Sequence, residues 1–132
     1  MTEKELSRFY WIKKEINDIE NRMGELGYGV GSSKLSFMPK SQPDNTSIEE
    51  RIVSKILELE HIYIDLRITA LEEYLKIENF LKSVEDPELR LIMRYRFLDL
   101  KKWEEIGVLL HMDRTTVARK CRRGIKDAHK SH

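Results

Sequence analysis

Cysteine, proline and aromatic residues are scarce in this chain of 132 residues, and long apolar runs are absent. The single cysteine, Cys121, excludes an intrachain disulfide. No apolar run is long enough to span a bilayer, and the opening Met-Thr-Glu-Lys-Glu lacks the apolar core of a signal peptide. We therefore expect a cytoplasmic protein that does not contact membranes, in which Cys121 is a small buried apolar residue.

The residue groupings that are typical of enzymes are also missing. No Gly-rich loop ends in Lys-Ser or Lys-Thr, and there is no nucleophile elbow. Glu72-Glu73 and Glu104-Glu105 are sequence neighbours, which point about 100° apart on a helix and make poor acid–base pairs. Only His129 and His132 have metal-ligand spacing, close to an end that we expect to fray. The sequence predicts neither an enzyme nor a bound metal or cofactor.

Charge is unevenly distributed, although the net charge is only +1. Residues 101–132 hold nine Lys and Arg against four Asp and Glu, whereas residues 1–100 hold fifteen against nineteen. A basic end on a mildly acidic remainder is typical of a protein with one DNA-binding and one protein-binding end.

Residues 1–84 are predicted to form a helical arm. Its first helix, over about 2–26, has apolar residues at alternating spacings of three and four, a heptad seam that needs a partner helix. The seam residues are Phe9, Ile12, Ile16, Ile19, Met23 and Leu26. Residues 27–46 are rich in Gly, Ser and Pro and are predicted to be a flexible loop. Within this loop Leu35, Phe37 and Met38 form an apolar patch that packs on the helices or docks on a partner.

A long helix is predicted over about 47–84, beginning at the capping-box sequence Ser47-Ile48-Glu49-Glu50. At about 1.5 Å per residue it would be roughly 55 Å long, which exceeds a compact domain of this size. Its apolar stripe widens between Ile62 and Leu75. The seam of the arm fits a helical hairpin within one chain or a homodimer interface, and the widening favours self-association.

Residues 86–130 are predicted to form three short helices, which makes the whole chain all-α. Asp86-Pro87 is a helix start, with a capping acceptor and a proline at the first helical position. Apolar and basic residues then recur at α-helical spacing, namely Leu89, Ile92, Met93, Arg96 and Phe97. A second helix begins near Lys102 and has Trp103, Ile106, Gly107 and Leu110 on one face. A turn follows over 111–113. Its last residue, Asp113, is the predicted cap of a third helix, which runs from about Arg114 to about His129.

The third helix has two chemically distinct faces. At about 100° per residue its apolar residues share one arc, which predicts the packing face. These are Val117, Cys121, Ile125 and Ala128. The opposite arc holds Thr115, Thr116, Arg119, Arg122, Arg123, Lys126 and Lys130. Such a helix suits the DNA major groove, with the preceding helix bracing it; a solvated basic helix on a bundle is the plainer alternative.

The runs Pro87-Glu88-Leu89-Arg90, Arg94-Tyr95-Arg96-Phe97, Trp103-Glu104-Glu105-Ile106-Gly107 and Arg114-Thr115-Thr116-Val117 resemble the fourth conserved region of bacterial sigma factors. More closely, the chain resembles small phage and prophage transcriptional regulators of the ArpU/RinA type, which join a helical N-terminal half to a sigma-like helix-turn-helix. The resemblance implies sequence-specific DNA binding and a role in late-operon expression. Two positions depart from the family pattern: His111 stands where glycine is usual, and Gly107 where alanine is usual.

The DNA-contacting residues that we expect fall into two groups. Base edges and nearby phosphates would be approached by Arg114, Thr115, Thr116, Arg119 and Arg123. The second group would mostly hold phosphates and consists of Lys120, Arg122, Lys126 and Lys130, while Lys101 and Lys102 before the bracing helix could touch the backbone too. Three other functions stay open: a sigma-like factor bound to RNA polymerase, a small terminase-like packaging protein, and a helical interaction module without DNA binding.

Overall fold

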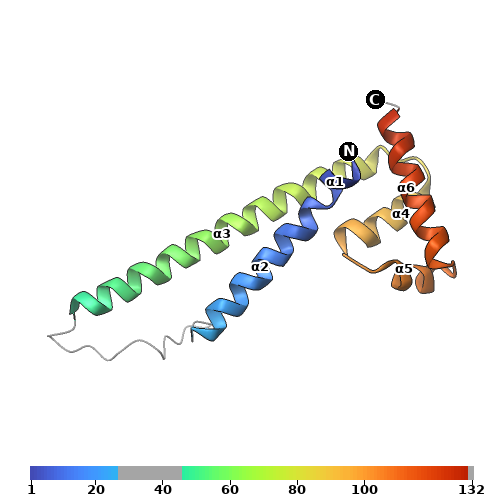
Figure 1. Ribbon diagram of the computed structural model, residues 1–132. Helices are drawn as coiled ribbons and strands as arrows, with labels where there is room; N and C mark the ends of the chain where they lie inside the picture. Colours follow the sequence, from blue (N-terminus) through green and yellow to red (C-terminus); the bar gives the residue numbers. More distant parts are fainter. Residues whose placement is uncertain (27–45, 131–132) are drawn as a thin grey trace. The chain divides into compact units, whose positions relative to one another are not determined.

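The computed structural model describes residues 1–26 and 46–130, which are helical and contain no strand (Figure 1). The all-α prediction is confirmed for these residues. The chain divides into two compact units, one made of Met1–Trp11 with Ala70–His132 and the other of Ile12–Thr69. The sequence places the boundary near residue 84 instead, where Asp86-Pro87 restarts the chain. The predicted loop, apart from Thr46, and its apolar patch lie outside the described residues, as does His132.

The N-terminal segment forms two helices, α1 (Glu3–Leu6) and α2 (Arg8–Glu25), and the prediction of a single helix over 2–26 is wrong at Ser7. The Ser7 hydroxyl donates to the Glu3 carbonyl over 2.9 Å, beside the backbone bond from the Ser7 N–H to the same carbonyl over 3.0 Å. Thr2 caps α1, because its hydroxyl oxygen accepts from the backbone N–H of Glu5 over 3.2 Å. Leu6 at the end of α1 is fully buried.

In the unit Ile12–Thr69, α2 runs antiparallel to the first part of α3 (Thr46–Lys82) (Figure 1). The hydroxyl of Tyr63 on α3 donates to the Glu20 carboxylate on α2 over 2.9 Å, and burial together with this bond raises the pKa of Tyr63. Ile16 and Met23 of the α2 seam are buried, whereas Leu26 is 56% exposed. Apart from Leu26, the α2 seam therefore packs within the chain.

The helix after Asp86 is not the regular α-helix that the sequence predicts. It consists of α4 (Pro87–Met93), capped as predicted by the Asp86 carboxylate on the Glu88 N–H over 3.0 Å, followed by the π-helical turn η2 (Arg94–Leu98). In η2 the Asp99 N–H donates to the Arg94 carbonyl, five residues back, over 3.1 Å. A π turn brings residues five apart to the same side. Two adjacent apolar pairs at that spacing are accordingly buried, Ile92-Met93 and Phe97-Leu98.

Two further helices complete this unit, α5 (Trp103–Leu110) and α6 (Arg114–Lys130), and they pack on each other. Both lie within a residue or so of their predicted bounds. Ile106 of α5 and Val117 of α6 are fully buried at their contact face. Arg94 of η2 forms an ion pair with Glu78 near the end of α3. This pair connects η2 to the last part of α3. Within the described ranges no helix is long and apolar enough to cross a membrane.

Candidate nucleic-acid interface

The two faces of α6 are separated as the sequence predicts. Val117, Cys121 and Ile125 are buried, and Ala128 is half-buried. Ala118, which the sequence did not assign to the packing face, is also buried at 8% exposure. Every residue of the predicted outer face is exposed, namely Thr115, Thr116, Arg119, Arg122, Arg123, Lys126 and Lys130.

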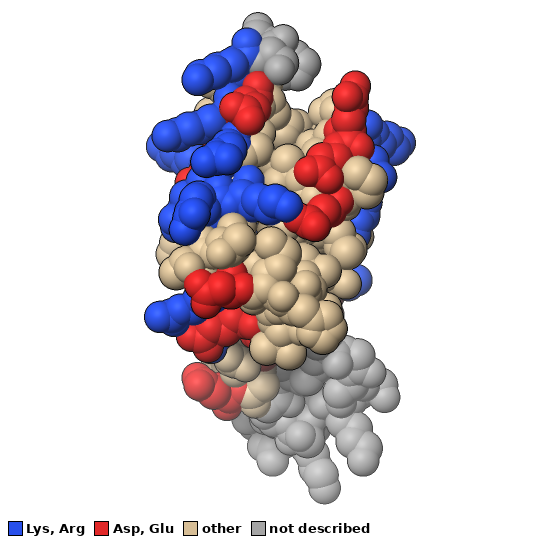
Figure 2. All heavy atoms as spheres, turned by 90° about the vertical axis from the view of Figure 1, so that its right-hand side faces the viewer, with Lys and Arg blue, Asp and Glu red and all other residues tan. Residues whose placement is uncertain are grey.

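The cations of α6 gather on one surface. An open hollow along the helix is lined by Thr115, Arg119, Arg122, Arg123, Lys126, Asp127 and Lys130. Figure 2 shows Lys and Arg side chains clustered on one side of the molecule's face, with acidic side chains beside them. Five of the seven lining residues are cations and one is an acid, so this surface favours a polyanion over a neutral or cationic ligand.

A turn of three residues, 111–113, joins α5 to α6. His111 caps the end of α5 in the left-handed region, with φ 55° and ψ 44°. The Met112 N–H donates to the Gly107 carbonyl over 2.9 Å, which closes the turn against α5. Gly107 and His111 therefore both lie at the α5 end of one tight connection.

Asp113 caps α6, as the sequence predicts. The hydroxyl of Thr115 donates to its carboxylate. This bond, with smaller contributions from the backbone N–H groups of Thr115 and Arg114, holds the pKa of Asp113 below its usual range. The capping carboxylate therefore stays ionised at the N-terminus of α6, where a negative charge complements the helix dipole.

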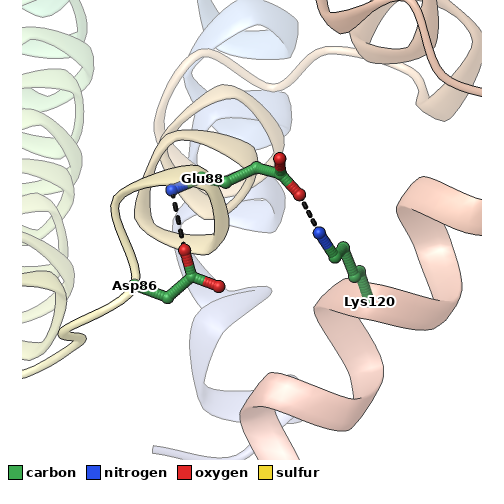
Figure 3. Close-up of polar contacts among 3 residues, drawn as sticks. All are labelled: Asp86, Glu88 and Lys120. Carbon is green, nitrogen blue, oxygen red and sulfur yellow. Dashed lines mark hydrogen bonds and ion pairs between the residues drawn. The ribbon is translucent and has the colours of Figure 1, made fainter.

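Two of the predicted DNA-contacting cations already have acidic partners. The ammonium of Lys120 pairs with Glu88 of α4, which is the residue after the proline of the Asp86-Pro87 start (Figure 3). The guanidinium of Arg114 pairs with Glu104 of α5 over 2.9 Å. Both pairs are well exposed, so each contributes about 1 kcal/mol at most to stability. Their larger effect is to direct these two cations toward α4 and α5.

Arg96 is a neighbouring cation that the sequence analysis did not assign to the site. Its guanidinium lies 4.3 Å from the centre of the Trp103 ring and donates to the Lys101 carbonyl over 3.1 Å. It lines a groove between η2, α5 and α6, with Lys102, Trp103, Glu104, Arg114, Thr115, Ala118 and Arg122. The sequence places Arg96 on the same face of a regular helix as Leu89, Ile92, Met93 and Phe97. Its position at this groove depends on the π turn and on stacking with Trp103.

The two lysines predicted to touch the DNA backbone lie at the start of α5. Lys101 is half-buried and Lys102 is exposed. The backbone N–H of Lys102 donates to the Glu105 carboxylate over 3.4 Å, a long bond that fixes the first turn of α5. Lys102 shares the groove of Arg96, whereas Lys101 contributes its carbonyl to hold Arg96 in place.

Cys121 lies beneath this surface rather than on it. It is 1% exposed, and burial raises its pKa to about 12. A thiol that stays protonated and covered is a packing residue and not a nucleophile. Across the described residues no group of three or more His, Cys, Asp or Glu is placed to hold a metal ion.

Comparisons of the chain with protein-family models, with curated proteins and with solved structures found no significant match. The assignment of a function therefore depends on the residues and geometry of α5, the turn and α6.

Proposed function

We propose that this protein is a sequence-specific, double-stranded-DNA-binding transcriptional regulator of phage or prophage origin that acts on late-operon expression. One observation carries the proposal. Five cations of α6 are exposed along one face, while its opposite face is buried against α4 and α5, with a turn of three residues joining it to α5. This is the arrangement required of a recognition helix, which must project from a rigid support into the major groove. The origin and the operon come from the resemblance to ArpU/RinA regulators.

In the proposed complex the N-terminal half of α6 enters the major groove. Thr115, Thr116 and Arg119 are exposed there and reach base edges, where Arg pairs bidentately with guanine. Arg122, Lys126 and Lys130 lie further along the helix and hold phosphates. Lys102 at the start of α5 touches the backbone on the other side of the turn.

DNA binding has an electrostatic cost at two positions of this interface, because Lys120 is paired with Glu88 and Arg114 with Glu104. A phosphate that approaches either cation competes with a carboxylate already in contact. Arg119, Arg123 and Lys126 therefore dominate the initial attraction to DNA, and Arg114 and Lys120 contribute less. Non-specific affinity is correspondingly moderate for a helix of this charge.

The test is fluorescence anisotropy of the full chain against a random duplex over a salt series, beside the Arg119→Glu/Arg123→Glu variant. We expect binding that weakens steeply with salt, because counterions are released from the phosphates, and that collapses in the variant. Both substituted residues are exposed, so circular dichroism should show an unchanged fold. A folded wild type that binds no duplex at low salt would rule out autonomous DNA binding.

A further inference from the structure

One carboxylate reaches across the contact between α5 and α6. Glu104 lies in the first turn of α5, and its Oε1 accepts from Nη1 of Arg114, the first residue of α6, over 2.9 Å. The two helices pack on each other within one compact unit. Neither side chain is covered, since 63% of Arg114 and 68% of Glu104 are exposed. The pair is therefore accessible to a ligand that approaches the N-terminus of α6.

The surroundings of this pair are otherwise basic. It lines the groove between η2, α5 and α6, where three further cations lie, Arg96, Lys102 and Arg122. Among the described residues of that lining, Glu104 is the one acid. A carboxylate among four cations lowers the attraction of the groove for an anion. The effect is strongest at Arg114, because Glu104 contacts it directly.

An arginine that is paired in this way can still bind a neutral partner. The guanidinium carries five N–H donors, and the contact with Glu104 uses one nitrogen, Nη1. Guanine presents two uncharged acceptors in the major groove, O6 and N7, so Arg114 can form two bonds with it beside the bond to Glu104. A phosphate carries a full negative charge, which the carboxylate repels. The ion pair therefore tolerates a base edge and disfavours the DNA backbone.

The place of Arg114 in the chain fits a contact with a base. In helix-turn-helix proteins the N-terminal residues of the second helix contact base edges, while the preceding helix crosses the backbone. Arg114 is the first residue of α6, and Glu104 lies at the start of the preceding helix. In the proposed complex the carboxylate is thus on the helix that meets the phosphates, and the guanidinium is on the helix that enters the groove.

We propose that Glu104 is a positioning residue, which directs Arg114 to guanine instead of phosphate and so raises the preference of the protein for its own site over other DNA. This role rests on the proposed DNA binding and adds to it a residue that acts through another. Glu104 holds the guanidinium in one orientation before DNA arrives, which lowers the entropy lost on binding. Its charge also penalises every register in which Arg114 meets a phosphate.

The test compares two duplexes, a site selected from a random library by the wild-type protein and a scrambled version of that site. Fluorescence anisotropy gives both affinities at one salt concentration. Glu104→Gln keeps the shape of the side chain and removes its charge. We expect it to bind the scrambled duplex about three- to tenfold more tightly, the scale of one exposed charge contact. Binding to the selected site should stay the same or weaken, so the ratio of the two affinities should fall.

Glu88→Gln is the matched control, because it removes the same charge from the other ion pair of α6. Its partner Lys120 is expected to hold phosphates on both duplexes, so this variant should bind both more tightly by a similar factor. Glu88 and Glu104 are both exposed, and circular dichroism should show an unchanged fold for each variant. A general effect of lost negative charge would change the ratio equally in the two variants.

A second series shows whether Glu104 acts through Arg114. Arg114→Ala should lower the ratio by about tenfold, since a bidentate pair with guanine is lost. In the double variant, Glu104→Gln should leave the ratio of Arg114→Ala unchanged, because the residue that it positions is absent.

Three results would overturn the proposal: an unchanged ratio for folded Glu104→Gln, an equal fall in Glu88→Gln, or a further fall on Glu104→Gln when Arg114 is absent. Each leaves the proposed DNA binding in place, because the wild type still prefers its site. A wild type that binds no duplex, or binds all duplexes equally, would contradict the proposed function and this role together. Measurements on the wild type alone therefore distinguish the two failures.

Discussion

A Cβ atom added at Gly107 would lie 2.5 Å from the carbonyl oxygen of Met112. Atoms do not approach that closely without a shift of the backbone, and the obstacle is itself backbone rather than a flexible side chain. The helix α5 and the turn that follows it are therefore in contact only because residue 107 has no side chain. Alanine at this position therefore does not fit the turn as it stands.

Gly107→Ala should destabilise the protein by about 1–3 kcal/mol, because the turn must move away from α5 to accept the methyl group. Urea unfolding followed by circular dichroism measures the change. Gly24→Ala is the matched control, since nothing lies within 4 Å of its added Cβ and it lies in α2. That control should be neutral or slightly stabilising, as alanine favours helix. A Gly107→Ala variant as stable as wild type would show that the turn yields to the methyl group at no cost.

His111→Gly should leave stability unchanged or raise it by up to about 1 kcal/mol. Glycine removes the cost of about 1–2 kcal/mol for a side chain in the left-handed region, but it loses more backbone entropy on folding. His111→Val should be destabilising, because a β-branched residue is least tolerant of φ 55°. Thermal unfolding of the three proteins in one buffer gives the order, and a valine variant as stable as the glycine variant would contradict it.

Cys121 should make the protein less stable at high pH. Its folded pKa is raised to about 12 from an ordinary value of 9.0, so its stabilising contribution is complete below pH 9. That contribution is lost as pH rises from 9 toward 12, by about 1.4 kcal/mol per pH unit, because the unfolded thiol ionises first. Urea unfolding between pH 8 and pH 11 measures it. Since lysines and tyrosines also titrate there, Cys121→Ala is the reference, and parallel pH curves for the two proteins would refute this prediction.

Lys126→Ala should weaken binding to any duplex more than Lys120→Ala does. Lys126 faces the open hollow along α6, whereas Lys120 is paired with Glu88. Removal of one cation that neutralises a phosphate should flatten the salt slope by about one unit, so Lys126→Ala should show this and Lys120→Ala should show less. Glu88→Gln should raise affinity by freeing Lys120 and removing a negative charge. Equal salt slopes for the two lysine variants would indicate that DNA displaces Glu88 completely.

Arg119→Ala should cost about 1–3 kcal/mol on a specific site selected from a random duplex library, and much less on unrelated DNA. Arg119 is exposed on the outer face of α6, one turn after Thr115 and Thr116. A bidentate pair with guanine accounts for such a difference between sequences. Competition assays on selected and scrambled sites measure it. An equal loss on every sequence would place Arg119 among the phosphate contacts.

Local signals in the sequence account for much of the C-terminal unit. Asp86-Pro87 predicts a capped helix start, and Asp113 predicts another. The short apolar stripe of α6 predicts which of its faces is buried, because 3.6-residue periodicity is a strong constraint on a helix of this length. Ala118 was missed since it lies at the edge of that stripe, where burial depends on the neighbouring α5 and η2 rather than on α6 alone.

The features that the sequence did not predict depend on contacts between distant residues. The π turn of η2 arises where Ile92-Met93 and Phe97-Leu98 are buried together, and an α-helical template assigns Leu98 to the outside. The position of Arg96 depends on stacking with Trp103, which no spacing rule gives. The spacing of the residues around Ser7 does not predict the break between α1 and α2. Which apolar residues of α3 are exposed within Ile12–Thr69 depends on which face α2 covers.

The π turn in η2 has a consequence for how this region tolerates insertions and deletions. A π turn holds one residue more than an α turn, so it acts as a correction of rotational phase between Pro87–Met93 and the residues that follow. Removing one residue from Arg94–Leu98 would allow regular α-helical winding and keep the rotation of the residues that follow, because the π turn accommodates one extra residue, whereas inserting a further residue would rotate them by about 100°. Chain length in this stretch, more than its composition, therefore determines which side chains reach the core.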